Sequence, residues 1–359
     1  MSPFFCMIMT SENAEIFNKV LTLGPSLKTH GGMASVLCAY RTMVPGFRHV
    51  ATNSRYGSVA GAFNAVGAAV RMVLERLRGR SILHVHSAAG KSFVRKTLFM
   101  RWGRLLGYKV IFHCHSGASI DYYRRRGIPE IKAILGRADA IVGLSDTWKR
   151  YFADTFGFRN VYVVTNPVEI PATAPQPAAG APLTLLFMGM IRDDKGVFDL
   201  VDTVAENAAR WRGRLKVRIG GSGEVQRLEC AIADAGIADI VEFIGWVSGA
   251  EKEQAYADAH IVVLPSYFEA LPMCILEGMA RRKAIIATAV GGIPDLVADG
   301  TNGRLLAPGD KDALGEAIDS YLDDRSLLDT YAAASLARAA SFSPEALRSN
   351  LLALYRSLS

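Results

Sequence analysis

The strongest constraint in the sequence is a succession of short apolar segments and longer helix-like segments that occurs twice along the chain. Short apolar runs separated by helical segments are typical of buried parallel strands with helices on both faces of the sheet. We interpret as strands residues 19–24, 82–87, 109–116, 140–145 and 161–166 in the first half, and 183–189, 215–221, 241–246, 261–266 and 284–288 in the second. The sequence therefore predicts an α/β protein with two Rossmann-like domains.

The segment between the two halves, PATAPQPAAGAP at 171–182, contains four prolines and no charged residue. Such a composition favours neither helix nor strand and indicates a linker. A chain of 359 residues is also too long for one ordinary core. The predicted order is an N-terminal extension at 1–18, a first domain at 19–170, the linker, a second domain at 183–341 and a closing helix at 342–359.

We expect the two parallel sheets to face each other across a cleft, because ligands bind beyond the carboxyl ends of parallel strands. The N-terminal extension lacks a basic leader, so we interpret it as poorly ordered and not as a signal peptide. No apolar run approaches the roughly 18 residues of a spanning helix. In the closing helix, Ser343 is a candidate cap and Pro344 suits the first position.

The charge of the chain is divided unevenly. Residues 1–170 carry 23 Lys/Arg and 9 Asp/Glu, and the remainder carries 18 and 25, which together give the net charge of +7. A basic half favours an anionic partner. Nucleic acid is not expected, because few aromatic residues stand among the cations. The five scattered cysteines form no C-x-x-C pair, which indicates free thiols in a reducing compartment.

Several residues suited to chemistry follow predicted strands of the first half. Gly31-Gly32 would let a ligand approach the backbone where a helix begins and offers free N–H groups to an anion. Four histidines end two strands, and residues two apart share a strand face: His84, His86, His113 and His115. A metal site is one interpretation. No carboxylate completes a ligand set, so the favoured hypothesis is one working histidine, His115, with no metal.

The second half carries two further loops after strands. Arg192 and Lys195 lie in the segment from Gly189 to Gly196, and two cations there could neutralise a phosphate group. The stretch Gly220–Glu224 is not G-x-G-x-x-G, which argues against a dinucleotide dehydrogenase.

The stretch EALPMCILE holds two carboxylates, Glu269 and Glu277, eight positions apart. Pro272 is expected at a helix start, with Glu269 in the preceding loop and Glu277 about one and a half turns into the helix. One carboxylate could accept hydrogen bonds from a sugar and the other from a ribose, with a phosphate at the helix N-terminus. A local structural network is the alternative.

In combination these motifs are similar to those of the retaining glycosyltransferases of family four, also called group 1 glycosyltransferases, which have the GT-B fold. The resemblance covers about residues 19–358, and the E-x7-E pair is its most specific part. The residues that carry it are Gly31-Gly32, His115-Ser116-Gly117, Gly189, Lys195-Gly196, Gly220–Glu224, Pro265-Ser266, Glu269, Glu277, Gly291-Gly292 and Asn302-Gly303.

The resemblance implies a nucleotide-sugar donor held mainly by the second domain, with Arg192 and Lys195 on the diphosphate. Glu269 would contact sugar hydroxyls and Glu277 the ribose. The remaining expected donor contacts are Gly31, Gly32, Gly189, Gly221 and the backbone amides of Ala270 and Leu271.

The resemblance further implies that His115 approaches the reacting sugar from the first domain. That domain would hold a saccharide or lipid-linked saccharide acceptor, and the closing helix would pack back across it. Capsule, exopolysaccharide or lipopolysaccharide synthesis would suit this chemistry. No cofactor is expected, and because Asp310-Lys311-Asp312 stands where a helix cap is needed, we expect metal-independent transfer.

The chain departs from the family pattern at several positions. Met190 stands where arginine is usual, Arg282 and Ala284 where glycine and proline are usual, and Asp295 where glutamate is common. A catalytically silent GT-B protein that binds a partner or a membrane is therefore an alternative. A GT-B nucleotide-sugar epimerase is another.

The basic half also contains the segment 91–109, which interleaves Lys/Arg with bulky apolar residues. This pattern resembles a helix that faces a membrane, although a core helix with a solvated face is the alternative. We expect a cytoplasmic protein that lies on the inner face of the cytoplasmic membrane and contacts its anionic surface.

Overall fold

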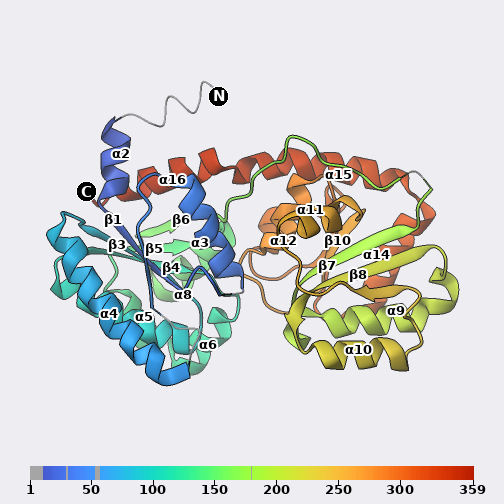
Figure 1. Cartoon of the computed structure of the whole chain (residues 1–359), viewed down its shortest axis with the longest axis horizontal. Coiled ribbons are helices and arrows are strands. Elements are labelled where there is room, and N and C mark those ends of the chain that lie inside the picture. Colours follow the sequence, from blue (N-terminus) through green and yellow to red (C-terminus); the bar gives the residue numbers. More distant parts are fainter. Residues whose placement is uncertain (1–10, 30, 53–56, 179) are drawn as a thin grey trace. The chain divides into compact units, whose positions relative to one another are not determined.

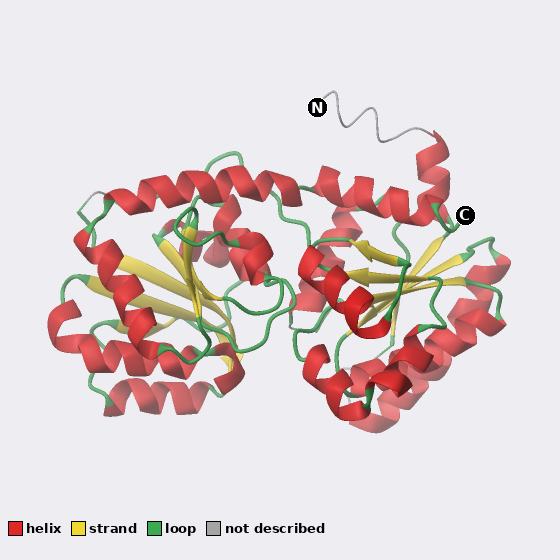
Figure 2. Ribbon diagram, turned by 180° about the vertical axis from the view of Figure 1, so that it is seen from behind, coloured by secondary structure: helices red, strands yellow, loops and turns green. Residues whose placement is uncertain are grey.

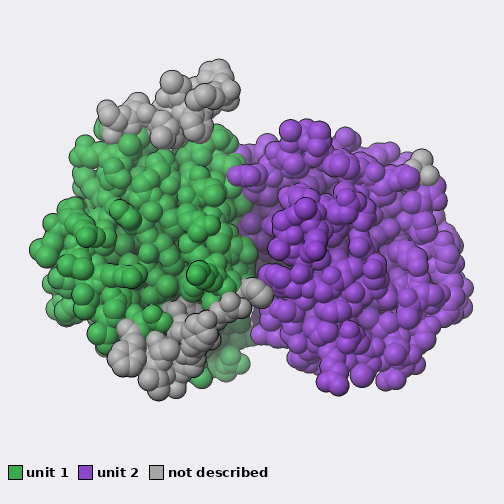
Figure 3. Space-filling model, viewed as in Figure 1, with its two compact units in different colours: residues 1–167, 344–359 green, residues 168–343 purple. Residues whose placement is uncertain are grey.

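The computed structural model describes residues 11–29, 31–52, 57–178 and 180–359. The chain forms two compact units, one of residues 1–167 with 344–359 and the other of residues 168–343 (Figure 3). In each unit, helices lie on both faces of one six-stranded sheet, and all neighbouring strands are parallel (Figure 1, Figure 2). The α/β class and the two Rossmann-like units that the sequence predicted are thus confirmed.

The first unit has the strand order β2-β1-β3-β4-β5-β6. Its strands β3 and β5 are buried along their whole length, as expected for a sheet covered on both faces. The elements of this unit are α2 (Ser11–Asn18), β1 (Val20–Gly24), α3 (Gly32–Met43), β2 (His49–Ala51), α4 (Gly57–Leu77), β3 (Ile82–Ser87), α5 (Lys91–Leu105), β4 (Lys109–Cys114), α6 (Ser119–Arg126), α7 (Ile128–Leu135), β5 (Ala140–Gly143), α8 (Asp146–Phe156), β6 (Val161–Val163) and α16 (Pro344–Arg356).

The second unit has the strand order β12-β11-β10-β7-β8-β9. The order reverses between β7 and β10, which places the topological switch point between these two neighbouring strands. The elements are β7 (Leu183–Ile191), η1 (Asp193–Lys195), α9 (Val197–Trp211), β8 (Leu215–Gly223), α10 (Val225–Asp234), β9 (Val241–Phe243), α11 (Gly249–Ala257), β10 (Ile261–Leu264), α12 (Met273–Ala280), β11 (Ala284–Thr288), α13 (Ile293–Leu296), β12 (Gly303–Leu306), α14 (Lys311–Asp323), α15 (Ser326–Ala339) and η2 (Ala340–Phe342).

The N-terminal extension is the clearest correction to the sequence-based expectation. Residues 1–10 lie outside the described part of the chain, but residues 11–18 form helix α2 and not a poorly ordered segment. This helix packs on α16: the rings of Phe17 and Tyr355 meet edge to face with centroids 5.9 Å apart, and Arg356 donates to Asn13 Oδ1 at 2.7 Å. The partner that orders α2 is more than 300 positions away in the sequence, so no local pattern reveals it.

Strands β7 and β8 are longer than the apolar runs that predicted them. They pair in register from Leu183 and Leu215 to Ile191 and Gly223. Gly189 and Gly221 therefore lie opposite each other inside the ladder and not in loops after it. A Cβ on Gly221 would collide with the carbonyl oxygen of Gly189, so the close pairing needs glycine here.

The proline-rich segment is attached to the second unit by a buried lysine. Nζ of Lys283 donates to the carbonyl oxygen of Pro175 at 3.2 Å and to Oε1 of Gln176 at 3.0 Å. Burial lowers the pKa of Lys283 to about 8. In the described part of the chain, no helix combines the length and the apolar character that crossing a membrane requires.

Candidate active site

The centre of the candidate site in the second unit is an ion pair at the switch point. Nζ of Lys195, after β7, lies 2.6 Å from Oε1 of Glu269, after β10, and the two side chains are only 20% and 14% exposed. Oγ of Ser266 donates to the same carboxylate oxygen at 3.1 Å. The pair therefore joins two neighbouring loops at the edge of the sheet where α/β proteins bind ligands.

Glycines allow the loops around this ion pair to pack closely. Gly196 has a positive φ of 66°, and a Cβ there would collide with the carbonyl oxygen of Pro265. Gly291, with φ of 54°, approaches the backbone of Glu269 in the same way, and Gly292 N–H donates to Ala270 O at 2.9 Å. Three loops, after β7, β10 and β11, are thereby fixed around Glu269.

The second carboxylate, Glu277, lies on α12 and is also held by two partners. Nζ of Lys252 lies 2.8 Å from its Oε1, and the hydroxyl of Tyr256 donates to its Oε2 at 2.9 Å. The side chain of Glu277 is only 16% exposed. Both partners come from α11, so a helix that the sequence did not connect with the site orients this carboxylate.

The N-terminal turn of α12 lies close to both carboxylates, Glu269 and Glu277. Pro272 stands at the N-cap of α12, as the sequence predicted, and Ala270 and Leu271 lie buried in the preceding loop. Burial, together with the negative charges of Glu269 and Glu277, raises the pKa of the Cys274 thiol. The thiol of Cys274 therefore lies close enough to both carboxylates for their negative charges to raise its pKa.

Arg192 pairs with Asp194, a carboxylate of its own loop, and not with Glu269. Its Nε and Nη2 donate to the two carboxylate oxygens of Asp194 at 2.8 and 2.5 Å, and its side chain is half exposed. Pairing with Asp194 raises the pKa of Arg192. Met190, where the family usually has arginine, is inside β7 and contacts the hydroxyl of Ser222 through its sulfur. Lys195 thus contacts Glu269, and Arg192 contacts its own local carboxylate.

The candidate residues of the first unit lie at the carboxyl edge of its sheet. Gly31, with φ of 132°, precedes the first turn of α3, and a Cβ on Gly31 or Gly32 would meet no atom of the described residues within 4 Å. His115 follows β4, and its N–H donates to Ser87 O at 2.8 Å. Because β1 and β4 are parallel strands of one sheet, these residues belong to the same edge.

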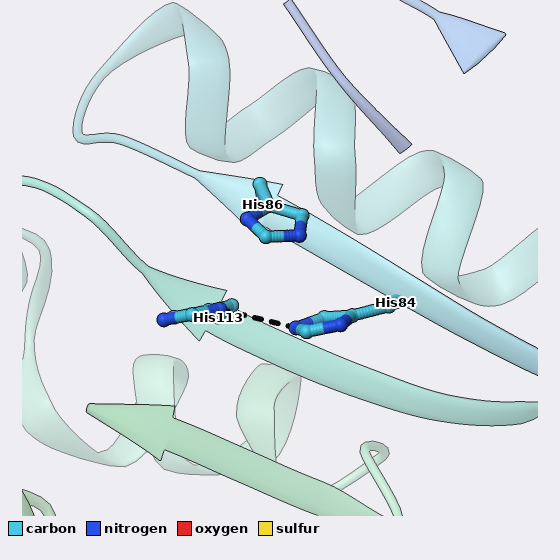
Figure 4. A group of neighbouring side chains, drawn as sticks. All are labelled: His84, His86 and His113. Carbon is cyan, nitrogen blue, oxygen red and sulfur yellow. Dashed lines mark hydrogen bonds between the residues drawn. The ribbon is translucent and has the colours of Figure 1, made fainter. Parts of the chain in front are cut away.

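His115 is one of four histidines whose rings contact one another. Its Nε2 lies 2.7 Å from Nδ1 of His86, and Nε2 of His84 lies 3.1 Å from Nδ1 of His113. Figure 4 shows the rings of His84, His86 and His113 gathered over two neighbouring strands. Burial lowers the pKa of His84 and of His115 to about 3. The imidazoles are therefore neutral at neutral pH.

The structure brings together some predicted residues and adds others. Lys195, Glu269, Ala270 and Leu271 share one region of the second unit, whereas Gly31, Gly32 and His115 belong to the first unit. The residues that sequence reasoning missed are Lys252 and Tyr256, which no local motif connects with the site. Ser266 is part of the motif that carries the family resemblance, and the structure adds its hydrogen bond to Glu269.

The fold is that of HepE from Anabaena, solved in complex with UDP: the TM-score is 0.73 at 18% identity, covering 94% of this chain and 100% of that chain. Two units, each built on a six-stranded parallel sheet, match the architecture of the GT-B class. Two family models match consecutive parts of the sequence, "Glycosyltransferase Family 4" at 20–170 and "Glycosyl transferases group 1" at 172–337. The chain therefore belongs to the group 1, or family 4, glycosyltransferases.

Curated relatives show the same family. The chain is 31% identical to the alpha-D-kanosaminyltransferase of Streptomyces kanamyceticus over 48% of this chain and 45% of that protein. It is 25% identical to the phosphatidyl-myo-inositol mannosyltransferase of Mycolicibacterium smegmatis over 77% of this chain and 71% of that protein. The chain spans less than half the length of several curated relatives that it matches.

Proposed function

We propose that the chain is a retaining glycosyltransferase that moves a sugar from a nucleotide-sugar donor to a saccharide or lipid-linked saccharide acceptor. The observation that carries this proposal is the Lys195–Glu269 pair at the switch point of a group 1 glycosyltransferase chain. Capsule, exopolysaccharide or lipopolysaccharide synthesis is the proposed setting. HepE, which shares the fold, was solved with UDP.

Lys195 is the proposed partner of the leaving diphosphate. Breaking a sugar–phosphate bond builds negative charge on the diphosphate, and a cation that is already in place lowers that barrier. The bonds of Lys195 to Glu269 and to Phe268 O hold its ammonium group in position before a donor arrives. Arg192 would first have to leave Asp194, so we assign Lys195 the larger share of the stabilisation.

Glu269 and Glu277 are the proposed acceptors for hydroxyl groups of the donor. A carboxylate offers about four lone-pair sites, so Glu269 can hold Lys195 and Ser266 and still accept from a sugar hydroxyl. Glu277, oriented by Lys252 and Tyr256, would accept from the ribose. In this proposal His115 acts as a neutral hydrogen-bonding group toward the sugar, because burial lowers its pKa to about 3.

The proposed transfer proceeds with retention and without a metal at the diphosphate. Front-face attack, in which the departing phosphate helps to deprotonate the acceptor, requires no nucleophile from the protein. Asp310, in the D-x-D triplet, caps α14 by accepting from Ala313 N–H at 2.9 Å, which supports a structural role for this carboxylate. Addition of Mg²⁺, Mn²⁺ or EDTA is expected to leave the transfer rate unchanged, and strict dependence on Mg²⁺ would contradict the mechanism.

We further propose that the first unit lies on the anionic inner surface of the cytoplasmic membrane. In the described part of the chain, most of the large apolar side chains that are exposed belong to α4 and α5: Val66, Val70, Leu74, Leu77, Val94, Leu98, Trp102 and Leu105. We call this set the α4–α5 surface. Indole Nε1 of Trp102 donates to Ala69 O, so the two helices are neighbours.

The charge on the same helices favours an anionic bilayer over a second protein copy. Helices α4 and α5 together carry seven Lys/Arg, of which only Lys96 is buried, and one Asp/Glu. That acid, Glu75, is neutralised by Arg78 and Arg80. A surface that combines exposed leucines with cations matches the acyl boundary and headgroups of an anionic membrane. Two copies of so basic a face would repel each other.

The proposed activity is tested by incubating the purified protein with UDP-, GDP- and ADP-sugars and measuring nucleotide release. Slow hydrolysis of one donor is expected, and Glu277→Ala should lose it. Glu253→Gln, a change of an exposed carboxylate on α11 that pairs with Arg281, is the matched control and should keep it. If no donor binds in calorimetry and none is hydrolysed with lipid-linked acceptors present, the chain is a silent binding protein. Formation of a changed free sugar nucleotide would instead show an epimerase.

A further inference from the structure

The histidine cluster of the first unit has features that hydrogen bonding among imidazoles does not explain. His84, His86 and His113 are fully buried, and one ring nitrogen from each lies within 4.8 Å of one from each of the others. Nε2 of His86 is buried and has no hydrogen-bond partner among the described residues. A buried polar atom without a partner costs on the order of 1–3 kcal/mol, so such atoms need an explanation.

We propose that His84, His86 and His113 bind a divalent late transition-metal ion, with Zn²⁺ as the ion of choice. Neutral imidazole is the ligand that zinc, copper, nickel and cobalt favour, and the first unit holds these three rings in the neutral state. Two nitrogens bound tetrahedrally to zinc lie about 3.3 Å apart. Nε2 of His84 and Nδ1 of His113 already lie 3.1 Å apart.

The surroundings of the rings match those of metal-bound histidines. A histidine that binds a metal through one nitrogen usually donates the other N–H to a nearby acceptor, which fixes the ring. If His84 binds through Nε2, its Nδ1 is 2.8 Å from the hydroxyl of Tyr355. If His86 binds through the otherwise unpartnered Nε2, its Nδ1 is 2.7 Å from Nε2 of His115. The assignment thus uses the orphaned Nε2 of His86 and leaves the outer nitrogens of His84 and His86 with a partner. The outer Nε2 of His113 is buried and has no hydrogen-bond partner among the described residues.

The proposed ion has a structural role that is separate from transfer chemistry. Two ligands come from β3 and one from β4, which are neighbours in register with His86 opposite His113. Tyr355, which contacts His84, lies on α16, the last helix of the chain. A bound ion would therefore stabilise the attachment of α16 to the sheet. Mg²⁺ prefers oxygen ligands and would not bind three imidazoles, so an effect of Mg²⁺ on transfer would report on the diphosphate and not on this histidine site.

The test uses the full-length protein with its affinity tag removed, so that no tag histidines bind metal. Elemental analysis by mass spectrometry and titration with Zn²⁺ and Co²⁺ are expected to give a single equivalent per chain. The Co²⁺ form should show the visible d–d bands of a nitrogen-bound ion, and Zn²⁺ should raise the Tm of the metal-free protein. These readouts do not depend on glycosyl transfer, so they remain informative if the proposed activity is wrong.

Substitutions of single histidines test whether the ion binds at this cluster. His84→Asn and His113→Asn should each abolish the single equivalent and the Co²⁺ bands, whereas His49→Gln, a change of a histidine on β2 outside the cluster, should keep both. Far-UV circular dichroism checks folding, and His86→Gln is the second choice if either variant unfolds. Failure of the wild-type protein to bind Zn²⁺ or Co²⁺ would overturn the proposal. So would unchanged stoichiometry in the cluster variants, or thiolate charge-transfer bands that point to cysteine ligands.

Discussion

Nζ of Lys195 lies 2.6 Å from Oε1 of Glu269, so the loops after β7 and β10 are joined by an ion pair at the point where the strand order reverses. If this pair contacts the donor, Glu269→Gln should lower kcat for nucleotide release on the order of 100-fold, because the charge is lost while the shape is kept. Lys195→Met should act similarly, and the double variant should be far from additive.

Lys311→Met changes an exposed lysine of the same unit that pairs with Glu206, and it serves as the control for the Lys195–Glu269 pair. It should leave kcat within twofold, which corresponds to a change of about 0.4 kcal/mol in the activation free energy. Steady-state kinetics with a fixed donor measures the wild type and all four variants. A Glu269→Gln variant with undiminished kcat would remove the ion pair from the proposed mechanism.

Tyr256→Phe removes only the hydroxyl that donates to Oε2 of Glu277 at 2.9 Å. A hydrogen bond to a charged group contributes about 1.5–3 kcal/mol, so the donor KM should rise on the order of 10-fold while kcat changes little. Tyr331→Phe, a change of a tyrosine of α15 in the same unit, should leave KM unchanged. Equal KM values for Tyr256→Phe and wild type would show that the orientation of Glu277 does not limit donor binding.

Arg282→Gly is expected to stabilise the protein. Arg282 has φ of 57° and ends α12 in a Schellman motif, in which its N–H donates to Met279 O and Lys283 N–H donates to Gly278 O. Holding a residue other than glycine in this left-handed conformation costs about 1–2 kcal/mol. Chemical denaturation should therefore show a gain of about 1 kcal/mol for Arg282→Gly, and none for Arg282→Ala, which keeps its Cβ. An unstable glycine variant would mean that Arg282 makes a contact worth more than the strain.

Stability should fall on acidification, in part because of His260. Burial and nearby Arg325 and Lys283 lower the pKa of His260 to about 4, and its Nδ1 accepts from Thr184 N–H at 3.1 Å. Between the unfolded value near 6.5 and pH 4, the unfolded state binds more protons, so the free energy of unfolding decreases as the pH falls. One histidine contributes at most about 1.4 kcal/mol per pH unit, and partial exposure reduces this amount.

His260→Asn keeps an acceptor close to the position of Nδ1 but does not titrate. The variant should show a shallower fall in unfolding free energy between pH 6.5 and pH 4, with stability near that of wild type at pH 8, in urea denaturation at each pH. Parallel curves for the two proteins would contradict the assignment of this pH dependence to His260.

Membrane binding is expected to depend on the α4–α5 surface. Leu77 and Leu105 are each 79% exposed, and burial of one leucine contributes about 1.5–3 kcal/mol. The double variant Leu77→Glu/Leu105→Glu should therefore lose flotation with anionic vesicles at low salt, whereas Trp246→Glu, a change of an exposed residue of the second unit, should float as wild type does. Absence of wild-type binding to anionic vesicles would remove the membrane proposal, and equal binding to neutral vesicles would remove its electrostatic part.

Local sequence patterns were sufficient to predict much of the secondary structure of the second unit and the positions of its two site carboxylates. The apolar run at 261–266 predicted β10, and Pro272 predicted the start of α12, so Glu269 and Glu277 lie in the expected loop and helix. These features depend on residues within about ten positions, where periodicity and backbone restrictions act. The same logic could not find Lys252 and Tyr256, because the contact between α11 and α12 arises from packing.

The sequence by itself determined the two Rossmann-like units, their parallel strands and the positions of the post-strand loops other than those after β7 and β8, because hydrophobic periodicity and glycine or proline restrictions are local. Only the tertiary structure decided which loops become neighbours: the strand order places Lys195 beside Glu269 and His84 beside His113. It also decided that residues 11–18 form a helix on α16. These outcomes depend on contacts between distant segments, whose energy becomes available only when the chain has closed the intervening loops.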